Sequence, residues 1–335
     1  MRRAILIATS LLFATLAWAQ ANPTVTTVPF ESQTLRQRAP FNVLLPAGYD
    51  SSVRRYPVLY LLHGIGDHYD TWVKNTNLVE YARPYPLIIV MPEGDKAWYV
   101  NGTSPNSRWE DYIMKEVMPY VDSHYRTLQQ VGMRATAGLS MGGYGALMLG
   151  LKHRDLFSFA ASMSGALAVT DWTPENMGPD MPDWIRQSIV AAFGPAGSPQ
   201  RKEYDLKQLI NAPVAELPFL YLDCGTEDHL LQQSRDFSRL LQEKKIPHEY
   251  RERPGIHEWP EWDHQIQEVL KVLWERWGMK PGAQRLAIGL VKAFKSALSI
   301  QQSATPPRIV ILSAAKDLLL DLQNRSNSLV SQCLA

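Results

Sequence analysis

A single serine lies between glycines in residues 138–145, which read GLSMGGYG. The first five fit the pattern G-x-S-x-G, in which a sharp turn from a strand into a helix exposes a serine hydroxyl as a nucleophile. Glycines suit the flanking positions because side chains there would collide with neighbouring backbone. An ordinary glycine turn is the alternative, whereas a dinucleotide-binding loop does not fit, since the spacing G-x-G-x-x-G is incomplete. Ser140 is therefore the candidate nucleophile.

A serine needs a base and an orienting carboxylate before it becomes a good nucleophile. In this strand–turn–helix setting the acid and then the histidine follow the serine, each on a loop after a strand. Glu227 and Asp228 both follow an apolar run that ends at Asp223, a residue still inside the strand and expected to be structural. His257 follows the next strand-like run, whereas its rival His264 falls inside a predicted helix. The spacing alone leaves Glu227 and Asp228 open.

Attack on a carbonyl also requires two backbone N–H groups that bind the oxyanion. One is expected from Met141, the residue after the serine, at the start of its helix. The other should come from the loop after the strand that ends at Leu62, where glycines let the backbone point inward. We expect the Ile65 N–H to be this second donor.

A metal site is not predicted. His257 and Glu258 begin like H-E-x-x-H, but Glu261 stands where the second histidine is required and Pro260 breaks the first turn. The two cysteines lack the spacing of a structural zinc site, and Cys224 is expected to be a buried, unpaired residue. No cofactor is implied.

The elements that must position these residues alternate along the chain. Apolar, strand-like runs cover 41–45, 57–62, 86–91, 134–139, 157–163, 217–223 and 248–251, and helix-period stretches cover 109–125, 141–153, 229–243 and 259–277. This alternation predicts an α/β fold with a mostly parallel sheet covered by helices on both faces. Residues 171–202, rich in Pro, Gly, Asp and Trp, interrupt it where a cap could be inserted.

Six segments carry a family resemblance in order: 57–64, 91–94, 109–112, 138–143, 223–228 and 255–259. Together they resemble the esterase D type family of α/β-hydrolases, which includes feruloyl and acetyl-xylan esterases, S-formylglutathione hydrolases and mycolyltransferases. The resemblance implies the α/β-hydrolase fold and places the acid at Asp228. The chain departs from the family in having Glu93 where Asp is more usual, which we expect to be harmless. The cysteine-bearing loop typical of formylglutathione hydrolases is also absent.

These residues predict a serine carboxylesterase that works through an acyl-enzyme. Ser140 attacks the ester carbonyl, His257 moves the proton and Asp228 orients the imidazole, while the N–H groups of Ile65 and Met141 bind the oxyanion. Two alternatives share this scaffold: acyl transfer to a sugar or alcohol, and a catalytically silent glycan-binding protein.

The substrate is expected to be a small-molecule or polysaccharide-linked ester. Several aromatic residues could stack on sugar or phenolic rings, although such residues are as often core packing. They are Trp98, Tyr99, Trp109, Trp172, Trp184, Trp259 and Trp262. The sequence does not indicate an oligomeric state.

The two ends of the chain differ from its middle. Residues 1–21 combine two arginines, an apolar run and small residues at the end, which is the pattern of a secretory signal peptide and predicts a secreted or periplasmic esterase domain over 22–278. An uncleaved N-terminal anchor is the alternative. Residues 279–335 hold seven Lys or Arg and two Asp or Glu, whereas the formal net charge of the whole chain is only +1. The rest of the chain is therefore mildly acidic and has no basic surface charge of the kind that binds nucleic acid. We expect this tail to be a poorly ordered extension rather than a membrane-contacting helix.

Overall fold

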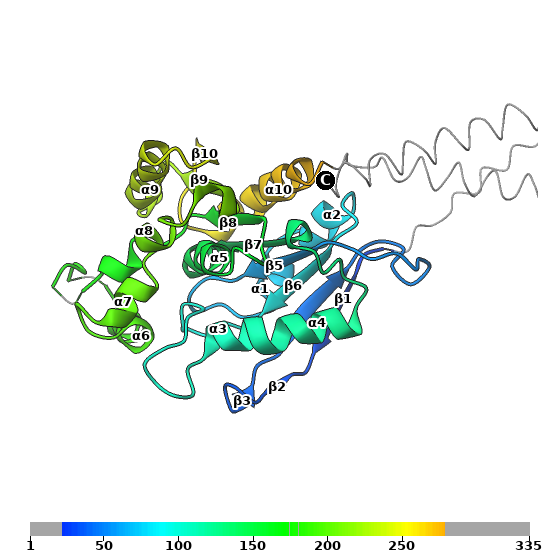
Figure 1. Cartoon of the computed structure of the whole chain (residues 1–335), viewed down its shortest axis with the longest axis horizontal. Coiled ribbons are helices and arrows are strands. Elements are labelled where there is room, and N and C mark those ends of the chain that lie inside the picture. The colour runs from blue at the N-terminus through cyan, green and yellow to red at the C-terminus, as the bar shows by residue number, and fades with distance from the viewer. Residues whose placement is uncertain (1–21, 174, 180, 279–335) are drawn as a thin grey trace, which may run out of the picture. The chain divides into compact units, whose positions relative to one another are not determined.

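The computed structural model describes residues 22–173, 175–179 and 181–278 (Figure 1). The predicted signal peptide over 1–21 and the predicted extension over 279–335 lie outside the described residues. Within the described part, no helix is both long enough and apolar enough to cross a bilayer.

One eight-stranded sheet organises the chain, in the order β1-β4-β6-β5-β7-β8-β9-β10 (Figure 1). In that order the strands are Thr24–Val28, Phe41–Leu45, Ile88–Pro92, Val58–Leu62, Arg134–Leu139, Phe159–Met163, Phe219–Gly225 and His248–Arg253. The β1–β4 and β4–β6 pairs are antiparallel, and every other pair in this sheet is parallel. The predicted, mostly parallel sheet is confirmed. A separate hairpin pairs β2 (Glu31–Ser32) with β3 (Gln37–Arg38).

Helices occupy the connections between the strands. They are α1 Thr71–Asn75, α2 Leu78–Ala82, α3 Trp109–Asp111, η1 Tyr112–Val117, α4 Met118–His124, η2 Val131–Met133, α5 Met141–Lys152, η3 Val169–Asp171, α6 Asp183–Phe193, α7 Pro199–Glu203, α8 Leu206–Leu209, η4 Val214–Glu216, α9 Leu231–Glu243 and α10 Trp259–Arg276. The stretch predicted as one helix over 109–125 contains a π-helical segment, η1. Pro119, at the start of α4, has no N–H to donate to the preceding turn, which favours this wider winding.

The core lies on both faces of the sheet. In β5 the side chains of Val58, Tyr60 and Leu62 enter one apolar cluster, which also contains residues of α4, α5 and α9. Leu59 and Leu61 enter the other cluster, with residues of α1, α2 and α10. A strand buried on both faces must be apolar at every position, which is why these strands are continuous apolar runs.

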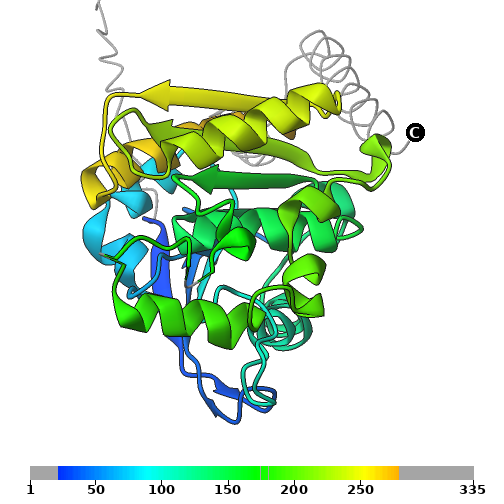
Figure 2. The same ribbon diagram turned by 90° about the vertical axis from the view of Figure 1, so that its left-hand side faces the viewer.

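The segment 171–202, predicted as a cap, contains α6 and most of α7 and packs against the body of the protein. The indole N–H of Trp98 donates to Ser188 Oγ (3.1 Å), and the backbone N–H of Thr103 donates to the carbonyl of Ala191 (2.8 Å). Figure 2 looks onto this side of the molecule and shows the green cap helices in the foreground. The cap therefore has fixed contacts with the loop that follows β6.

Candidate active site

Ser140 joins β7 to α5 in a strained conformation. Its φ of 53° and ψ of −116° lie in a region that non-glycine residues rarely adopt. The surrounding backbone holds it there, because the Ser140 N–H donates to the carbonyl of Met163 (3.0 Å) and its carbonyl accepts from the N–H of Ala166 (3.2 Å). Such strain at the end of a central strand points the serine side chain away from both the strand and the helix.

The glycines around Ser140 are required by close backbone contacts. A Cβ on Gly138 would lie 2.3 Å from the carbonyl oxygen of Gly142, and a Cβ on Gly142 would lie 2.5 Å from that of His63. Both distances are far shorter than any normal contact, so no larger residue fits at either position. This crowding distinguishes the segment from an ordinary glycine turn.

A hydrogen-bonded chain links Ser140 to His257 and Asp228. The Ser140 hydroxyl donates to Nε2 of His257 (2.9 Å), and Nδ1 of His257 donates to Oδ2 of Asp228 (2.8 Å). The Asp228 side chain is fully buried, whereas the His257 ring is 19% exposed. The structure thus brings together the three side chains predicted from the sequence, from the ends of β7 and β9 and the loop after β10.

Asp228 is held as a carboxylate. Burial alone would raise its pKa, but the hydrogen bond and charge of His257, together with the Leu230 N–H, lower the pKa below its ordinary value. The Leu230 N–H donates to Oδ1 of Asp228 at 2.8 Å. An ionised Asp228 fixes the tautomer with the proton on Nδ1 and leaves the Nε2 lone pair facing Ser140. His257 can then accept the serine proton as the oxygen attacks.

The other candidates, Glu227, Asp223 and His264, make no hydrogen bond to Ser140 or His257 among the described residues. Glu227 is exposed and its carboxylate accepts from the Gly255 N–H (2.6 Å), while the Glu227 N–H donates to the Gly255 carbonyl (3.0 Å). Asp223 is buried in β9, and burial raises its pKa to about 6. His264 is exposed on α10. Of these carboxylates, Asp228 is the one hydrogen-bonded to His257.

The loop of residues 63–68, here called the oxyanion loop, makes a tight turn beside Ser140. The Asp67 N–H donates to the Gly64 carbonyl (3.2 Å), and Gly66 has a φ of +86°, a conformation suited to glycine. A Cβ placed on Gly64 would lie 3.6 Å from the Ser140 Cβ. Neither Ile65 nor Met141 uses its backbone N–H for a hydrogen bond among the described residues. Both amides are therefore free to bind an oxyanion.

The Glu93 side chain contacts both ends of the oxyanion loop. Its carboxylate lies 3.4 Å from Nε2 of His63 and 3.3 Å from Nδ1 of His68, and accepts from the N–H groups of Gly94 (3.1 Å) and Asp95 (2.9 Å). Burial alone would raise the pKa of Glu93, but the hydrogen bond and charge of His63, the Asp95 N–H and the charge of His68 lower it to about 2. The sequence identified Glu93 only as a departure from the family pattern and gave it no contacts.

Two neighbours of His257 were not predicted. The His229 ring lies 4.6 Å from the His257 ring, and the Trp262 ring lies 5.0 Å from it, both edge-on. Burial, followed by the charge of His257, lowers the pKa of His229. Potential metal-ligand atoms of Asp228, His229 and His257 lie within 4.8 Å of one another. The sequence feature that could have identified His229 is its position next to Asp228.

Comparison with known proteins identifies the family. The model of the family described as "Putative esterase" matches residues 32–273. Esterase Rv1288 of Mycobacterium tuberculosis is 32% identical over 252 residues, covering 68% of this chain and 54% of that protein. The acetyl esterase of Caldicellulosiruptor saccharolyticus is 26% identical over 255 residues, covering 71% and 94% of the two chains.

A solved structure is similar over the same region. The substrate-bound serine hydrolase FphF of Staphylococcus aureus has a TM-score of 0.65 and 26% identity, covering 76% of this chain and 99% of its own. The chain spans about half the length of the mycobacterial esterase. The family match covers most of the chain and includes the strained serine and its hydrogen-bonded histidine. The chain therefore belongs to the esterase family and has the α/β-hydrolase fold.

Proposed function

We propose that this protein is an exported serine carboxylesterase that hydrolyses acyl or carbohydrate-linked esters through an acyl-enzyme intermediate. The main support is the continuous hydrogen-bonded chain from Ser140 through His257 to Asp228, which begins at a serine in strained backbone. Family membership and the name of the acetyl esterase relative support an ester as the substrate. The proposal of export rests on residues 1–21.

The first half of the reaction transfers the acyl group to the enzyme. Ser140 Oγ attacks the carbonyl carbon while Nε2 of His257 takes the serine proton. The carbonyl oxygen becomes an oxyanion and accepts hydrogen bonds from the N–H groups of Ile65 and Met141. When the tetrahedral intermediate collapses, the bond to the alcohol oxygen breaks and His257 returns its proton to that oxygen. Asp228 stays ionised throughout and stabilises the imidazolium.

The second half releases the acid. A water molecule gives a proton to Nε2 of His257 and attacks the acyl carbon, and the resulting oxyanion uses the same two N–H groups. Collapse of this intermediate breaks the bond to Ser140 Oγ, which recovers the proton from His257. The products are a carboxylic acid and an alcohol, and the enzyme returns to its starting state.

Acyl transfer is the second candidate, because relatives that match this chain include one named diacylglycerol acyltransferase/mycolyltransferase. It would use the same side chains, with an acceptor hydroxyl in place of water. Turnover of an acetyl ester with and without a sugar acceptor, followed by product analysis, separates the two. Hydrolysis predicts free acetate as the main product in both mixtures.

Hydrolysis of 4-nitrophenyl acetate and labelling by a serine-directed phosphonate test the proposed function. We expect release of nitrophenol and a phosphonate adduct on the peptide that contains Ser140. Ser140→Ala should lose both. An active, unlabelled parent or a fully active Ser140→Ala variant would overturn the proposed nucleophile, and an inactive, unlabelled parent would favour a catalytically silent scaffold.

A further inference from the structure

The structure distinguishes among the aromatic residues that could contact a substrate. Trp98, Tyr99, Trp109 and Trp262 are buried in the core. Trp172 and Trp259 are half-buried and pack against other tryptophan rings. Trp184 is 42% exposed and is the only aromatic residue among the large apolar side chains exposed in the described part of the chain. Of these seven residues, Trp184 is the one whose indole lies open to solvent.

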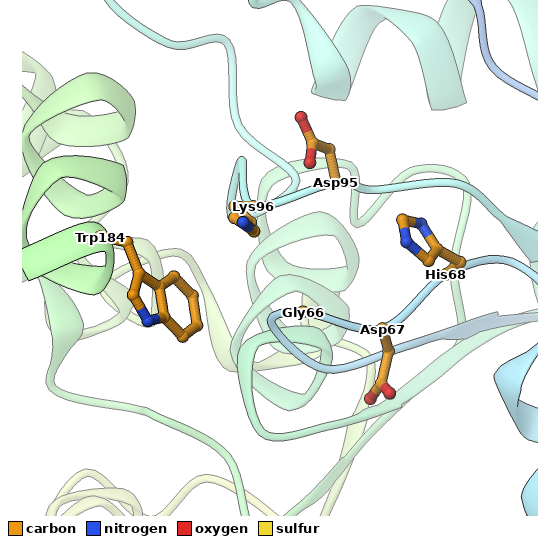
Figure 3. Close-up of a pocket in the computed structure, with 6 residues that line it drawn as sticks. All are labelled: Gly66, Asp67, His68, Asp95, Lys96 and Trp184. Carbon is orange, nitrogen blue, oxygen red and sulfur yellow. The ribbon is translucent and has the colours of Figure 1, made fainter. Parts of the chain in front are cut away.

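Trp184 forms one wall of a pocket of about 280 Å³. The other walls come from two loops, and the complete lining is Gly66, Asp67, His68, Asp95, Lys96 and Trp184. Figure 3 shows Trp184 projecting from the helix toward Lys96 and Gly66. Pockets for drug-sized ligands occupy roughly 300–1,000 Å³. This smaller volume suits a single ring rather than a long chain.

The lining combines one aromatic face with charged groups. Nζ of Lys96 lies 5.0 Å from the centre of the Trp184 ring. Among the ion pairs of the described residues none includes Lys96 or Asp95, and the contact of the Lys96 ammonium within this pocket is with the Trp184 ring. A sugar ring fits this combination, because its C–H face packs on an indole while its hydroxyls both donate and accept hydrogen bonds. A phenolic acyl group would instead favour apolar walls on both sides.

The loops that line the pocket continue from residues next to Ser140. It begins at Gly66, which directly follows Ile65 in the oxyanion loop, and Gly64 of the same loop faces Ser140. The second loop, at Asp95 and Lys96, continues from Glu93, whose carboxylate contacts His63 and His68 at either end of the oxyanion loop. These loop connections are the basis for inferring that a substrate bound at Ser140 extends into the pocket.

We propose that this pocket binds a pyranose ring belonging to the alcohol part of the substrate, with Trp184 as its stacking surface and Lys96 as a donor to its hydroxyls. The proposal rests on the proposed esterase function and assigns part of the substrate to a place on the enzyme. It makes Trp184 a specificity-determining residue, distinct from the groups that act on the ester bond.

The test compares two acetyl esters on the full-length protein. One is an O-acetylated methyl β-xylopyranoside, and the other is 4-nitrophenyl acetate, whose alcohol carries no sugar. The variants are Trp184→Ala, Trp184→Phe and the control Val190→Ala, an apolar residue on the same helix that is 38% exposed and outside the pocket lining. The measured quantity is the ratio of kcat/KM for the sugar ester to kcat/KM for the nitrophenyl ester.

We expect Trp184→Ala to lower this ratio about tenfold, mainly through KM for the sugar ester, as loss of an aromatic contact of about 1.4 kcal/mol would do. Trp184→Phe should retain most of the ratio, and Val190→Ala should retain all of it. An unchanged ratio in Trp184→Ala, or an equal fall for both esters, would overturn the proposal. Methyl ferulate is assayed with the same variants as a third ester, and a loss confined to it would assign the pocket to an aromatic acyl group and would also overturn the proposal.

A binding measurement separates this proposal from the esterase function. Xylobiose is titrated into the Ser140→Ala variant with and without Trp184→Ala, and heat or tryptophan fluorescence is followed. We expect the second substitution to weaken binding about tenfold. This result would support the pocket even if the parent enzyme showed no ester turnover, whereas equal affinities would refute it.

Discussion

Replacing Glu93 with Gln should destabilise the protein strongly at pH 5 and less at pH 3. The pKa of this carboxyl falls from 4.5 to about 2 on folding. Because the folded pKa is the lower one, the carboxylate stabilises the fold above pH 4.5, and this contribution is lost as the pH falls toward 2. The linkage relation gives about 3 kcal/mol at pH 5 and about half of that at pH 3. The Glu93 side chain is only 10% exposed, so solvent screening should reduce these figures little.

Urea unfolding of the parent and of Glu93→Gln at both pH values measures the two differences. Glu252→Gln is the matched control, because the pKa of Glu252 is also lowered to about 2, chiefly by its hydrogen bond with Arg235, but on the exposed surface. A surface ion pair of this kind contributes at most about 1 kcal/mol and is weakened by salt. The reasoning is refuted if Glu93→Gln costs no more than Glu252→Gln, or if its cost fails to shrink between pH 5 and pH 3.

Four further outcomes are expected. His257→Ala should lower kcat for 4-nitrophenyl acetate by about 10⁶-fold, whereas His264→Ala should change it less than about threefold, and a reversal would disprove the assignment of the base. Asp228→Asn should lower kcat by about 10⁴-fold without a large change in thermal stability, because it favours the wrong tautomer of the imidazole, and normal turnover would contradict its role. Gly142→Ala should cost about 3 kcal/mol in urea unfolding, since its Cβ would lie 2.5 Å from a backbone oxygen, and a neutral result would show that the turn can relax. A chain of residues 22–278 should match the full-length protein in melting temperature and ester turnover, and aggregation or a clearly lower melting temperature would show that residues outside this range stabilise the fold.

The regular elements could be predicted because they depend on local patterns. All seven predicted strands are present, since a strand buried on both faces leaves a continuous apolar run. The edge strand β1 was missed because its sequence TVTTV is short and mostly exposed, so its apolar residues form no such run. The π-helical segment η1 was also missed, although Pro119 marks where the regular winding fails.

The candidate site divides in the same way. Ser140, Asp228 and His257 could be found because each follows a strand, and the ends of parallel strands meet at one edge of a sheet. Their roles in catalysis remain predictions for the variants to test. The contacts of Glu93 and His229 could not be found, because they depend on how loops from different strands meet. The exposure of Trp184 likewise depends on where the cap packs, which no local pattern specifies.

The paired hydrogen bonds between Glu227 and Gly255 join the loop of the acid to the loop of the histidine. Ser140 is fastened elsewhere, to the backbone of Met163 and Ala166. The site thus consists of two parts, with Asp228 and His257 on one and Ser140 on the other, and they are joined through β9, because the Ser164 N–H donates to the Asp223 carbonyl (2.7 Å). The Asp228–His257 pair is held within one pair of loops, whereas the Nε2–Oγ contact depends on how β7, β8 and β9 stay in register. A change in that register would therefore alter the distance between base and nucleophile before it altered the orientation of the base.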